Sequence, residues 1–207
     1  NHYTANLRLR HDDAYTAGGQ AGFRPDRTVT VYSQILKRLF PHTPVVVGGI
    51  EASLRRLTHY DYWEDRLMPS ILASSGADLL VYGMGDRTIT EVARAMRNGY
   101  NAKLLRKIPQ VAFLADRSYV ERLDSATTVR LHSFEVCQKS KDAFGENFAI
   151  IETLSNLMHP DKTLVEGVGE QFVVVTPPHS PLTTEELDRS FDLPYERAPH
   201  PRYKDRG

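Results

Sequence analysis

The densest group of chemically versatile side chains is the run HYDYWED, at residues 59–65. It holds one imidazole, two phenols, three carboxylates and the single tryptophan of the chain. The imidazole could act as a general base oriented by a neighbouring carboxylate, since such pairs transfer protons near neutral pH. The rings could instead stack on a planar ligand or anchor a partner, or pack in the core while the carboxylates face water. The candidates from this run are His59, Tyr60, Asp61, Tyr62 and Trp63.

Glycines that follow two apolar runs form the second group: VVVGG at 45–49 and LLVYGMG at 79–85. Glycines after buried strands let a ligand approach backbone N–H groups at the carboxyl edge of a parallel sheet. The dinucleotide motif G-x-G-x-x-G is incomplete in both, and Asp86 adds negative charge where a pyrophosphate needs positive charge. The alternative is that the glycines only allow tight turns. The candidates here are Gly48, Gly49, Glu51, Ser53, Arg55, Arg56, Gly83, Gly85 and Asp86.

Neither a catalytic residue nor a metal site is predicted within the chain. Cys137 is its one cysteine, so the chain can form no internal disulfide. One thiol cannot by itself ligate zinc or an iron–sulfur cluster. Residues 59–65 show no metal-type spacing and no order typical of a Ser–His–Asp triad.

Charge and hydropathy argue against several classes of partner. The sequence has 26 Lys and Arg residues against 26 Asp and Glu residues, which gives a formal net charge of zero. A protein that binds a polyanion normally carries a surplus of positive charge, so there is no strong nucleic-acid signal. The longest apolar runs are too short to span a membrane, and no secretion signal is recognisable, so no membrane partner is expected. We therefore expect a cytoplasmic location.

Alternating strands and helices must position these groups. Apolar periodicity predicts helices over 28–39 and 66–75, and a third helix from a Thr88–Glu91 capping box to Gly99. Short apolar runs predict buried strands at 45–47, 77–82 and 111–115. This alternation is typical of a parallel, doubly wound sheet. The carboxyl ends of the first two strands would then bring both groups of glycines to one edge.

The pattern changes after residue 127. A helix is predicted over 142–157, followed by a hairpin of strands 163–168 and 170–176 and by a capping box at Thr183–Glu186. Proline-rich stretches at 177–182 and 193–201 are typical of rigid connectors, or of a strap that docks on a neighbouring domain. We therefore predict two units, 1–127 and 128–207. Because the chain begins with Asn and ends in a loop-like KDRG, we expect it to be a fragment of a longer protein.

Four motifs, in order along the chain, carry a resemblance to a known family. They are GGIEASLRR with HYDYW, ADLLVYGMGDR, VVTPPHSPLTTEELD and LPYERAPHP. They resemble the YgiQ family of radical S-adenosylmethionine (SAM) proteins, and the likeness covers essentially the whole chain. The resemblance implies an α/β fold: a Rossmann-like (cobalamin-binding-like) parallel sheet with flanking helices, plus a C-terminal α+β extension. It also implies that 1–127 is a partial domain whose early strands are missing, and that 128–207 leads toward a radical SAM barrel absent from this chain.

The resemblance also implies cofactors for the full-length protein. Radical SAM proteins hold a 4Fe–4S cluster on the three thiolates of a CxxxCxxC loop, and the open iron binds SAM. This chain has only Cys137, so we expect the fragment to bind neither group and to be inactive alone. Cobalamin domains of the related class bind their cofactor with a D-x-H-x-x-G run and a Gly-Gly pair. Only the pair Gly48-Gly49 is present, so the sequence neither predicts cobalamin binding nor excludes it.

From the resemblance we expect the N-terminal domain of a radical SAM iron–sulfur enzyme of unknown substrate. This domain would shape or cap the substrate site of the barrel in the same polypeptide, with the candidate residues facing the cleft between the two. The alternative is a non-catalytic binding module whose aromatic run anchors a protein or RNA partner. A free-standing nucleotide-binding domain is a further alternative, which the missing third glycine and Asp86 disfavour.

Overall fold

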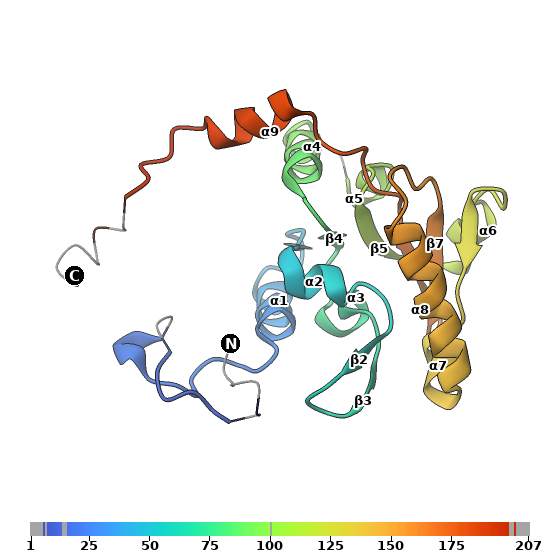
Figure 1. Cartoon of the computed structure of the whole chain (residues 1–207), viewed down its shortest axis with the longest axis horizontal. Helices are drawn as coiled ribbons and strands as arrows, with labels where there is room; N and C mark the ends of the chain where they lie inside the picture. Colours follow the sequence, from blue (N-terminus) through green and yellow to red (C-terminus); the bar gives the residue numbers. More distant parts are fainter. Residues whose placement is uncertain (1–5, 7, 14–15, 100, 199–200, 202–207) are drawn as a thin grey trace.

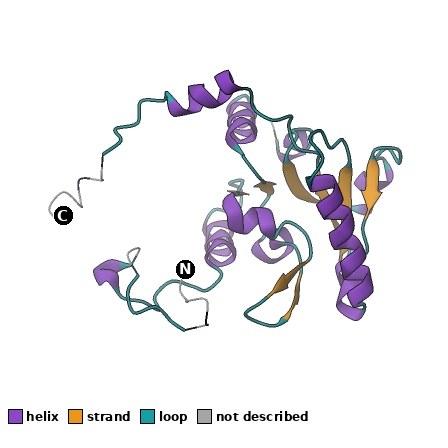
Figure 2. Cartoon of the chain, viewed as in Figure 1, coloured by secondary structure: helices purple, strands orange, loops and turns teal. Residues whose placement is uncertain are grey.

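The computed structural model describes residue 6 and residues 8–13, 16–99, 101–198 and 201 (Figure 1). Its helices are η1 (Ala17–Gly19), α1 (Thr28–Leu39), α2 (Gly49–Leu54), α3 (Ile71–Ser75), α4 (Asp86–Arg97), α5 (Ala102–Leu105), α6 (Arg117–Glu121), α7 (Phe134–Lys139), α8 (Lys141–Ser155) and α9 (Thr184–Phe191). Its strands are β1 (Val46–Val47), β2 (His59–Asp61), β3 (Arg66–Met68), β4 (Leu79–Val81), β5 (Val111–Ala115), β6 (Thr128–Arg130), β7 (Thr163–Val168) and β8 (Gln171–Val175). Figure 2 shows the strands with helices packed around them.

Six strands form one sheet in the order β1-β4-β5-β8-β7-β6. β1 pairs parallel with β4 and β7 pairs parallel with β6, whereas the three pairings between them are antiparallel. The predicted α/β class with flanking helices is confirmed, but the sheet is mixed and not wholly parallel. The reason is that α4 and α5 return the chain to the carboxyl end of β4, where the backbone N–H of Tyr82 donates to the carbonyl of Gln110 at 3.3 Å. β5 therefore starts where β4 ends and runs in the opposite direction.

The strands after residue 128 belong to the same sheet. β7 and β8 form the hairpin that the sequence predicts, and its bounds agree to within one residue. β8 also pairs with β5, from Ala112 opposite Val175 to Ala115 opposite Phe172. One sheet thus crosses the boundary between 1–127 and 128–207, and the division into two units stays a prediction.

Two hydrophobic clusters cover the two faces of the sheet. The first includes side chains of α2 and α3, with partly buried residues of α1 and α8 packed against it, and the second includes side chains of α4 and α6. β8 shows how the strands serve both: Val173 and Val175 belong to the first cluster and Val174 to the second. Successive side chains of a strand point to opposite faces, so β1, β4, β5, β7 and β8 each contribute to both cores. The result is a three-layer arrangement of helices, sheet and helices.

The predicted helix over 66–75 is wrong in its first half. The first residues of this range form β3, which pairs antiparallel with β2 in a separate two-stranded sheet. Pro69 explains the break, because proline disfavours helical backbone at the residue before it. The helix that follows, α3, begins only after Ser70, whose hydroxyl accepts a hydrogen bond from the backbone N–H of Leu72.

The two predicted capping boxes have different outcomes. At Thr183–Glu186 both hydrogen bonds of the box are present, so α9 begins as predicted. At Thr88–Glu91 the prediction is wrong, because α4 begins at Asp86 and has Gly85 as its N-cap. The earlier start places Thr88 inside the first turn, where it is fully buried and cannot cap the helix.

α9 and the residues after it extend away from the sheet (Figure 1). α9 lies beside α4, where the guanidinium of Arg87 is 4.0 Å from the carboxylate of Glu186. Farther along, the hydrogen bonds found among the described residues are local; for example, the Arg197 guanidinium donates to the carbonyl of Phe191 at 2.6 Å. The segment is therefore held to the sheet mainly at its start.

Candidate functional site

The carboxyl ends of β1, β4 and β8 lie at one edge of the sheet, which we call the carboxyl edge. β8 runs in the same direction as β4 because both are antiparallel to β5. The two glycine turns meet here, since the backbone N–H of Gly83 donates to the hydroxyl of Ser53 at 3.1 Å. The fold thus brings together the candidates of residues 48–56 and those of 83–86.

The glycines at the carboxyl edge allow close packing of the backbone. A Cβ atom on Gly48 would lie 3.1 Å from the carbonyl oxygen of Val81, and one on Gly85 would lie 2.8 Å from Val81 Cγ1. Gly49 and Gly83 have φ angles of +81° and +66°, which favour glycine. These contacts account for the glycines without any phosphate ligand.

Arg56 is a half-buried cation at the carboxyl edge. Its guanidinium lies over the ring of Tyr82, 5.0 Å from the ring centroid, and its Nη1 donates to the carbonyl of Ser53 at 2.6 Å. Its Nε is buried and has no hydrogen-bond partner in the described part of the chain. Burial lowers the pKa of Arg56, and the neighbouring Tyr82 and Glu152 oppose this shift. This charge is therefore less fully compensated than that of the adjacent Arg55, which has a carboxylate partner.

The remaining candidates of the carboxyl edge have structural explanations. The Arg55 guanidinium pairs with the Glu51 carboxylate at 3.1 Å, one helical turn away. Asp86 is exposed in the first turn of α4, where an acid stabilises the helix through its dipole. Ser53 serves as the link between α2 and the turn after β4.

Gln110 holds the turn after β4 in place. Its side-chain amide donates to the carbonyls of Tyr82 and Met84, both at 2.7 Å, and accepts from the backbone N–H of His179 at 3.2 Å. Gln110 is buried and has a φ of +65°, which is uncommon for a residue with a side chain. Sequence analysis missed this residue, because the sequence around it carries no signal for a left-handed backbone.

His59 and Asp61 do not form the acid–base pair that the catalytic interpretation of this run requires. The Nδ1 of His59 lies 3.1 Å from the carbonyl of Leu57, so this nitrogen carries the proton and donates to that oxygen. Burial lowers the pKa of His59 and favours the neutral ring. The carboxylate of Asp61 instead accepts from the backbone N–H groups of Trp63 and Glu64, at 3.0 and 3.1 Å. The geometry gives no support for a base at His59 oriented by Asp61.

Asp61 fastens this region to the N-terminal part of the chain. The residue is 4% exposed, and its carboxylate accepts from the guanidinium of Arg27 at 3.0 Å. Arg27 also pairs with Glu64 at 2.6 Å, and Glu64 pairs with Arg66. Burial alone would raise the pKa of Asp61, but the hydrogen bonds from the backbone N–H of Glu64 and from Arg27 outweigh it and hold the pKa below its usual value.

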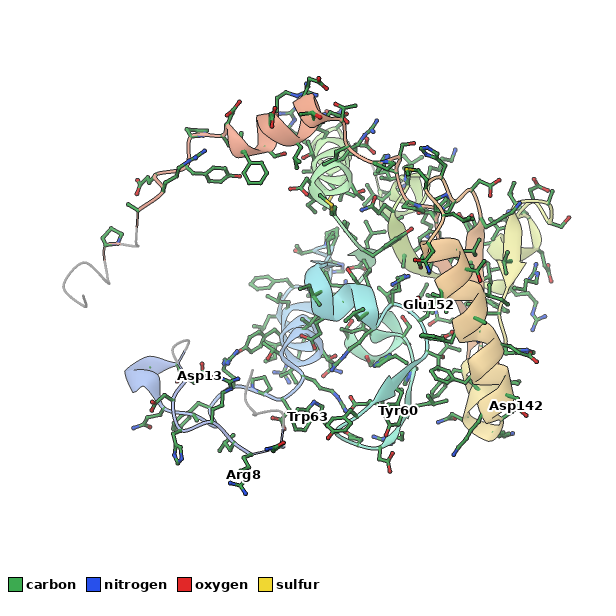
Figure 3. The ribbon with its side chains drawn as sticks, viewed as in Figure 1. Arg8, Asp13, Tyr60, Trp63, Asp142 and Glu152 are labelled. Carbon is green, nitrogen blue, oxygen red and sulfur yellow. The ribbon has the colours of Figure 1, made fainter. Side chains whose placement is uncertain are left out.

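Three aromatic rings are exposed on the hairpin of β2 and β3, which we call the aromatic hairpin (residues 59–68). Tyr60, Tyr62 and Trp63 have exposed fractions of 51%, 60% and 47%. Tyr62 and Trp63 meet edge to face with ring centroids 5.9 Å apart, and the Tyr60 hydroxyl donates to Asp65 at 2.5 Å. Figure 3 shows Tyr60 and Trp63 on this hairpin, at the end of the molecule away from α4 and α9. The interpretation that places these rings in the core is wrong.

Glu166 is a buried carboxyl group that sequence analysis missed. It lies in β7, is 1% exposed, and accepts from the backbone N–H of Thr58 at 2.9 and 3.1 Å and from the Thr58 hydroxyl at 2.7 Å. Thr58 directly precedes the aromatic hairpin. Burial raises the pKa of Glu166 to about 7, against the lowering effect of the bonds from Thr58. The only sequence signal is an acid within the apolar run LVEGV, which a strand prediction assigns to a solvent-facing position.

The described part of the chain contains no group of three or more His, Cys, Asp or Glu side chains that could hold a metal ion. The thiol of Cys137 is buried against the amide of Asn147. A 4Fe–4S cluster held on three thiolates does not fit these residues, since the sequence has one cysteine. Two surface hollows, of about 450 Å³ beside residues 9–12 and 18–21 and about 350 Å³ along α4, are lined by none of the candidates.

All of residues 1–207 match the family model described as Radical SAM N-terminal. The chain belongs to this family. It is 49% identical over 204 residues to a UPF0313 protein of Porphyromonas gingivalis and 47% identical over 215 residues to one of Bacteroides thetaiotaomicron. A UPF0313 protein of Bradyrhizobium diazoefficiens is 42% identical over 221 residues. These matches confirm the family resemblance that the motifs indicate.

The radical SAM N-terminal chain is shorter than these relatives. Each alignment covers 99% of this chain but only 32% to 34% of the relative, so the chain spans about a third of the length of the curated relatives that it matches. No solved structure matches it significantly. None of the described helices is long and apolar enough to cross a membrane.

Proposed function

We propose that this chain is the N-terminal domain of a radical SAM iron–sulfur enzyme, and that its carboxyl edge shapes or caps the substrate site of a barrel in the same polypeptide. Family membership supports the first part of the proposal, because radical SAM proteins use a 4Fe–4S cluster and SAM. The ligands of the cluster would come from outside this chain, which has one cysteine. The domain would therefore position a substrate, whose identity is open, and would carry out no radical step itself.

The second part of the proposal rests on an exposed apolar surface at the carboxyl edge. Ile50 and Leu54, one turn apart on α2, are 81% and 71% exposed, and Met84 in the turn after β4 is 65% exposed. A hydrogen bond joins these two elements, so the three side chains belong to one region. Exposed apolar side chains gathered near a polar centre are typical of interaction surfaces and ligand sites. A domain that covered them would also cover Arg56.

Arg56 is the group that we expect to orient the substrate. A guanidinium stacked on an aromatic ring keeps a planar edge for the bidentate binding of a carboxylate or phosphate. The contacts of Arg56 with Tyr82 and with the Ser53 carbonyl hold its plane. Once a barrel excludes water from the carboxyl edge, the attraction between this cation and an anionic substrate group becomes stronger.

The test uses the full-length protein with its cluster reconstituted, and it measures the rate of SAM cleavage to 5′-deoxyadenosine. Met84→Glu puts a charge into the proposed contact with the barrel, and Arg56→Lys keeps the charge but removes the planar fork. We expect each substitution to lower the rate at least about tenfold by disturbing the position of the substrate. Unchanged rates in both variants would remove the carboxyl edge from the substrate site.

Val136→Glu is the matched control for Met84→Glu. Val136 is 44% exposed on α7, so the substitution also puts a charge at an exposed apolar position. α7 lies at the opposite edge of the sheet, because the neighbouring Glu135 accepts from the backbone N–H of Gly169 in the turn between β7 and β8. We expect Val136→Glu to leave SAM cleavage unchanged, and an equal loss in both variants would show a general effect of added charge.

The aromatic hairpin favours a second candidate function, a non-catalytic module that binds a protein or RNA partner. Its three exposed rings are held in place by the salt bridge between buried Asp61 and half-buried Arg27. Trp63 is the sole tryptophan of the chain, so its fluorescence reports on this surface. If bases stack on the rings, a single-stranded RNA homopolymer should quench the fluorescence saturably, and Tyr62→Ala should weaken that binding about tenfold. Quenching that Tyr62→Ala leaves unchanged would argue against the hairpin.

A further inference from the structure

One buried carboxyl group ties the aromatic hairpin to the sheet. Glu166 of β7 accepts hydrogen bonds from both the backbone N–H and the hydroxyl of Thr58, which is 108 residues away in the sequence and directly precedes β2. Its immediate surroundings in the sheet are apolar, with Val165 before it and Val173 opposite it on β8. An ionised carboxylate is costly to bury in such a place unless a cation accompanies it.

No cation pairs with Glu166 in the part of the chain that the structure describes. α7 packs against β7 and presents two titratable groups to it. The carboxylate of Glu135 repels the charge of Glu166, and the thiol of Cys137 is near enough for Glu166 to raise its pKa. From α8, the neutral amide of Asn147 bonds to that thiol.

Three basic side chains next to Thr58 or on β3 make contacts with groups other than Glu166. Two residues before Thr58, the Arg56 guanidinium lies over the ring of Tyr82. One residue after Thr58, the His59 ring bonds to the carbonyl of Leu57. On β3, which also packs against α7, Arg66 pairs with Glu64. The tether between Glu166 and Thr58 therefore has to hold without charge compensation whenever Glu166 is ionised.

We propose that Glu166 makes the position of the aromatic hairpin depend on proton binding. The protonated side chain keeps residues 57–61 closed on β7. When the proton leaves, the closed arrangement holds an uncompensated buried charge, and the segment opens so that water reaches the carboxylate. Opening displaces Arg56 on one side of Thr58 and the aromatic rings on the other. The consequence for substrate binding rests on the proposed function, but the movement itself does not.

The direction of the effect follows from the sign of the pKa shift. In the closed arrangement burial raises the pKa of Glu166 to about 7, whereas the ordinary value for a hydrated glutamate is 4.5. The closed arrangement thus binds the proton more tightly than the open one. Closure is fully favoured below the ordinary value and is lost progressively as the pH rises to about 7, so the hairpin is loosest at slightly alkaline pH.

The experiment measures hydrogen exchange of the Thr58 amide and the fluorescence of Trp63 in this chain between about pH 5.5 and pH 8.5. Protection of the amide, corrected for the intrinsic exchange rate, should fall at least about tenfold across this range, with a parallel change in fluorescence. Glu166→Gln keeps an acceptor for Thr58 but cannot ionise, so it should stay closed and remove the transition. Glu135→Gln should keep the transition and move its midpoint to lower pH, since it removes the repelling charge.

Two further measurements keep the outcomes separable. His59→Asn removes the titratable side chain that directly follows Thr58, and the transition should persist in it. Far-UV circular dichroism reports whether each variant folds; if Glu166→Gln does not, the midpoint in Glu135→Gln decides. A wild-type pH profile in folded Glu166→Gln, or an unshifted midpoint in Glu135→Gln, would overturn the proposal. Neither result depends on SAM cleavage, so this proposal and the proposed function can fail independently.

Discussion

Two buried carboxyl groups hold the aromatic hairpin, one near its tip and one at its base. They differ in whether a cation compensates the negative charge. At the tip, Asp61 is 4% exposed and accepts from the guanidinium of Arg27 and from two backbone N–H groups. At the base, Glu166 is 1% exposed and accepts only neutral donors, all from Thr58, among the described residues. The pKa of Asp61 is lowered, and that of Glu166 is raised to about 7.

This difference shows that burial alone does not set the protonation of a buried acid. Burial is the largest influence on both side chains and acts in the same direction on both. At Asp61 the hydrogen bonds from the backbone N–H of Glu64 and from the Arg27 guanidinium outweigh burial, whereas at Glu166 the hydrogen bonds from Thr58 do not. Asp61 therefore holds the tip of the hairpin at neutral pH, whereas Glu166 holds its base only while Glu166 is protonated.

The largest effect on stability is expected from removing the carboxylate of Asp61. Asp61→Ala removes the acceptor of two backbone N–H groups and one of the two carboxylate partners of Arg27, so the free energy of unfolding at pH 7 should fall by about 3 kcal/mol. Urea unfolding followed by circular dichroism measures the loss. Asp65→Asn is the control, because Asp65 is exposed, bonds to the exposed Tyr60 and has a positive φ that asparagine tolerates, so it should cost at most about 0.5 kcal/mol. Similar losses in the two variants would contradict the role given to burial at Asp61.

Local sequence patterns predicted the elements of the fold well. The helix over 28–39 and the strand over 111–115 have the predicted bounds, and the hairpin of 163–176 is present. Apolar periodicity and turn chemistry act within a few residues, so they are readable without knowledge of the rest of the chain. The direction of β5 was not readable, because it depends on where α5 returns the chain.

The candidate site also contains residues that local sequence patterns indicate and residues that they do not. Ser53 and Gly83 meet at the carboxyl edge because each follows a strand that ends there, and the strands themselves are readable from short apolar runs. Glu166 and Gln110 were missed because each acts through partners far away in the sequence, such as Thr58. Nothing in a single sequence identifies the partner of a buried acid 108 residues away.

The interaction between Glu166 and Thr58 should make the free energy of unfolding depend on pH. The raised pKa of Glu166 means that its contribution is fully present below the unfolded value of 4.5 and is lost as the pH rises to about 7. Glu166→Gln lacks this loss, so its free energy of unfolding relative to wild type should improve by about 2 kcal/mol between pH 5 and pH 8. Urea unfolding at both pH values measures it. A difference between the two chains that stays constant with pH would show that Glu166 keeps one protonation state in the fold.

Gln110 also stabilises a turn through buried hydrogen bonds, but unlike Asp61 and Glu166 it cannot ionise. Gln110→Ala removes three hydrogen bonds at the turn after β4 and should lower the free energy of unfolding by about 1.5 kcal/mol. Gln110→Gly removes the same bonds but relieves the positive φ, so it should lose about 1 kcal/mol less. Because no charge is involved, the loss should be equal at pH 5 and pH 8 by urea unfolding. A loss that varied with pH would mean that the turn is coupled to one of the acids.

The smallest effect is expected at α9, which is stabilised by its N-terminal capping box and lies beside α4. Thr183→Ala removes the acceptor for the backbone N–H of Glu186, which should cost the helix about 1 kcal/mol locally. Amide exchange within α9 should quicken about fivefold, while the urea unfolding of the sheet should not change. Thr184→Ala, one residue later and outside the cap, is the control and should alter neither measurement. If Thr183→Ala destabilised the sheet as much as the helix, α9 would unfold together with the sheet. Its cap would then contribute to global stability, as the contacts of the aromatic hairpin do.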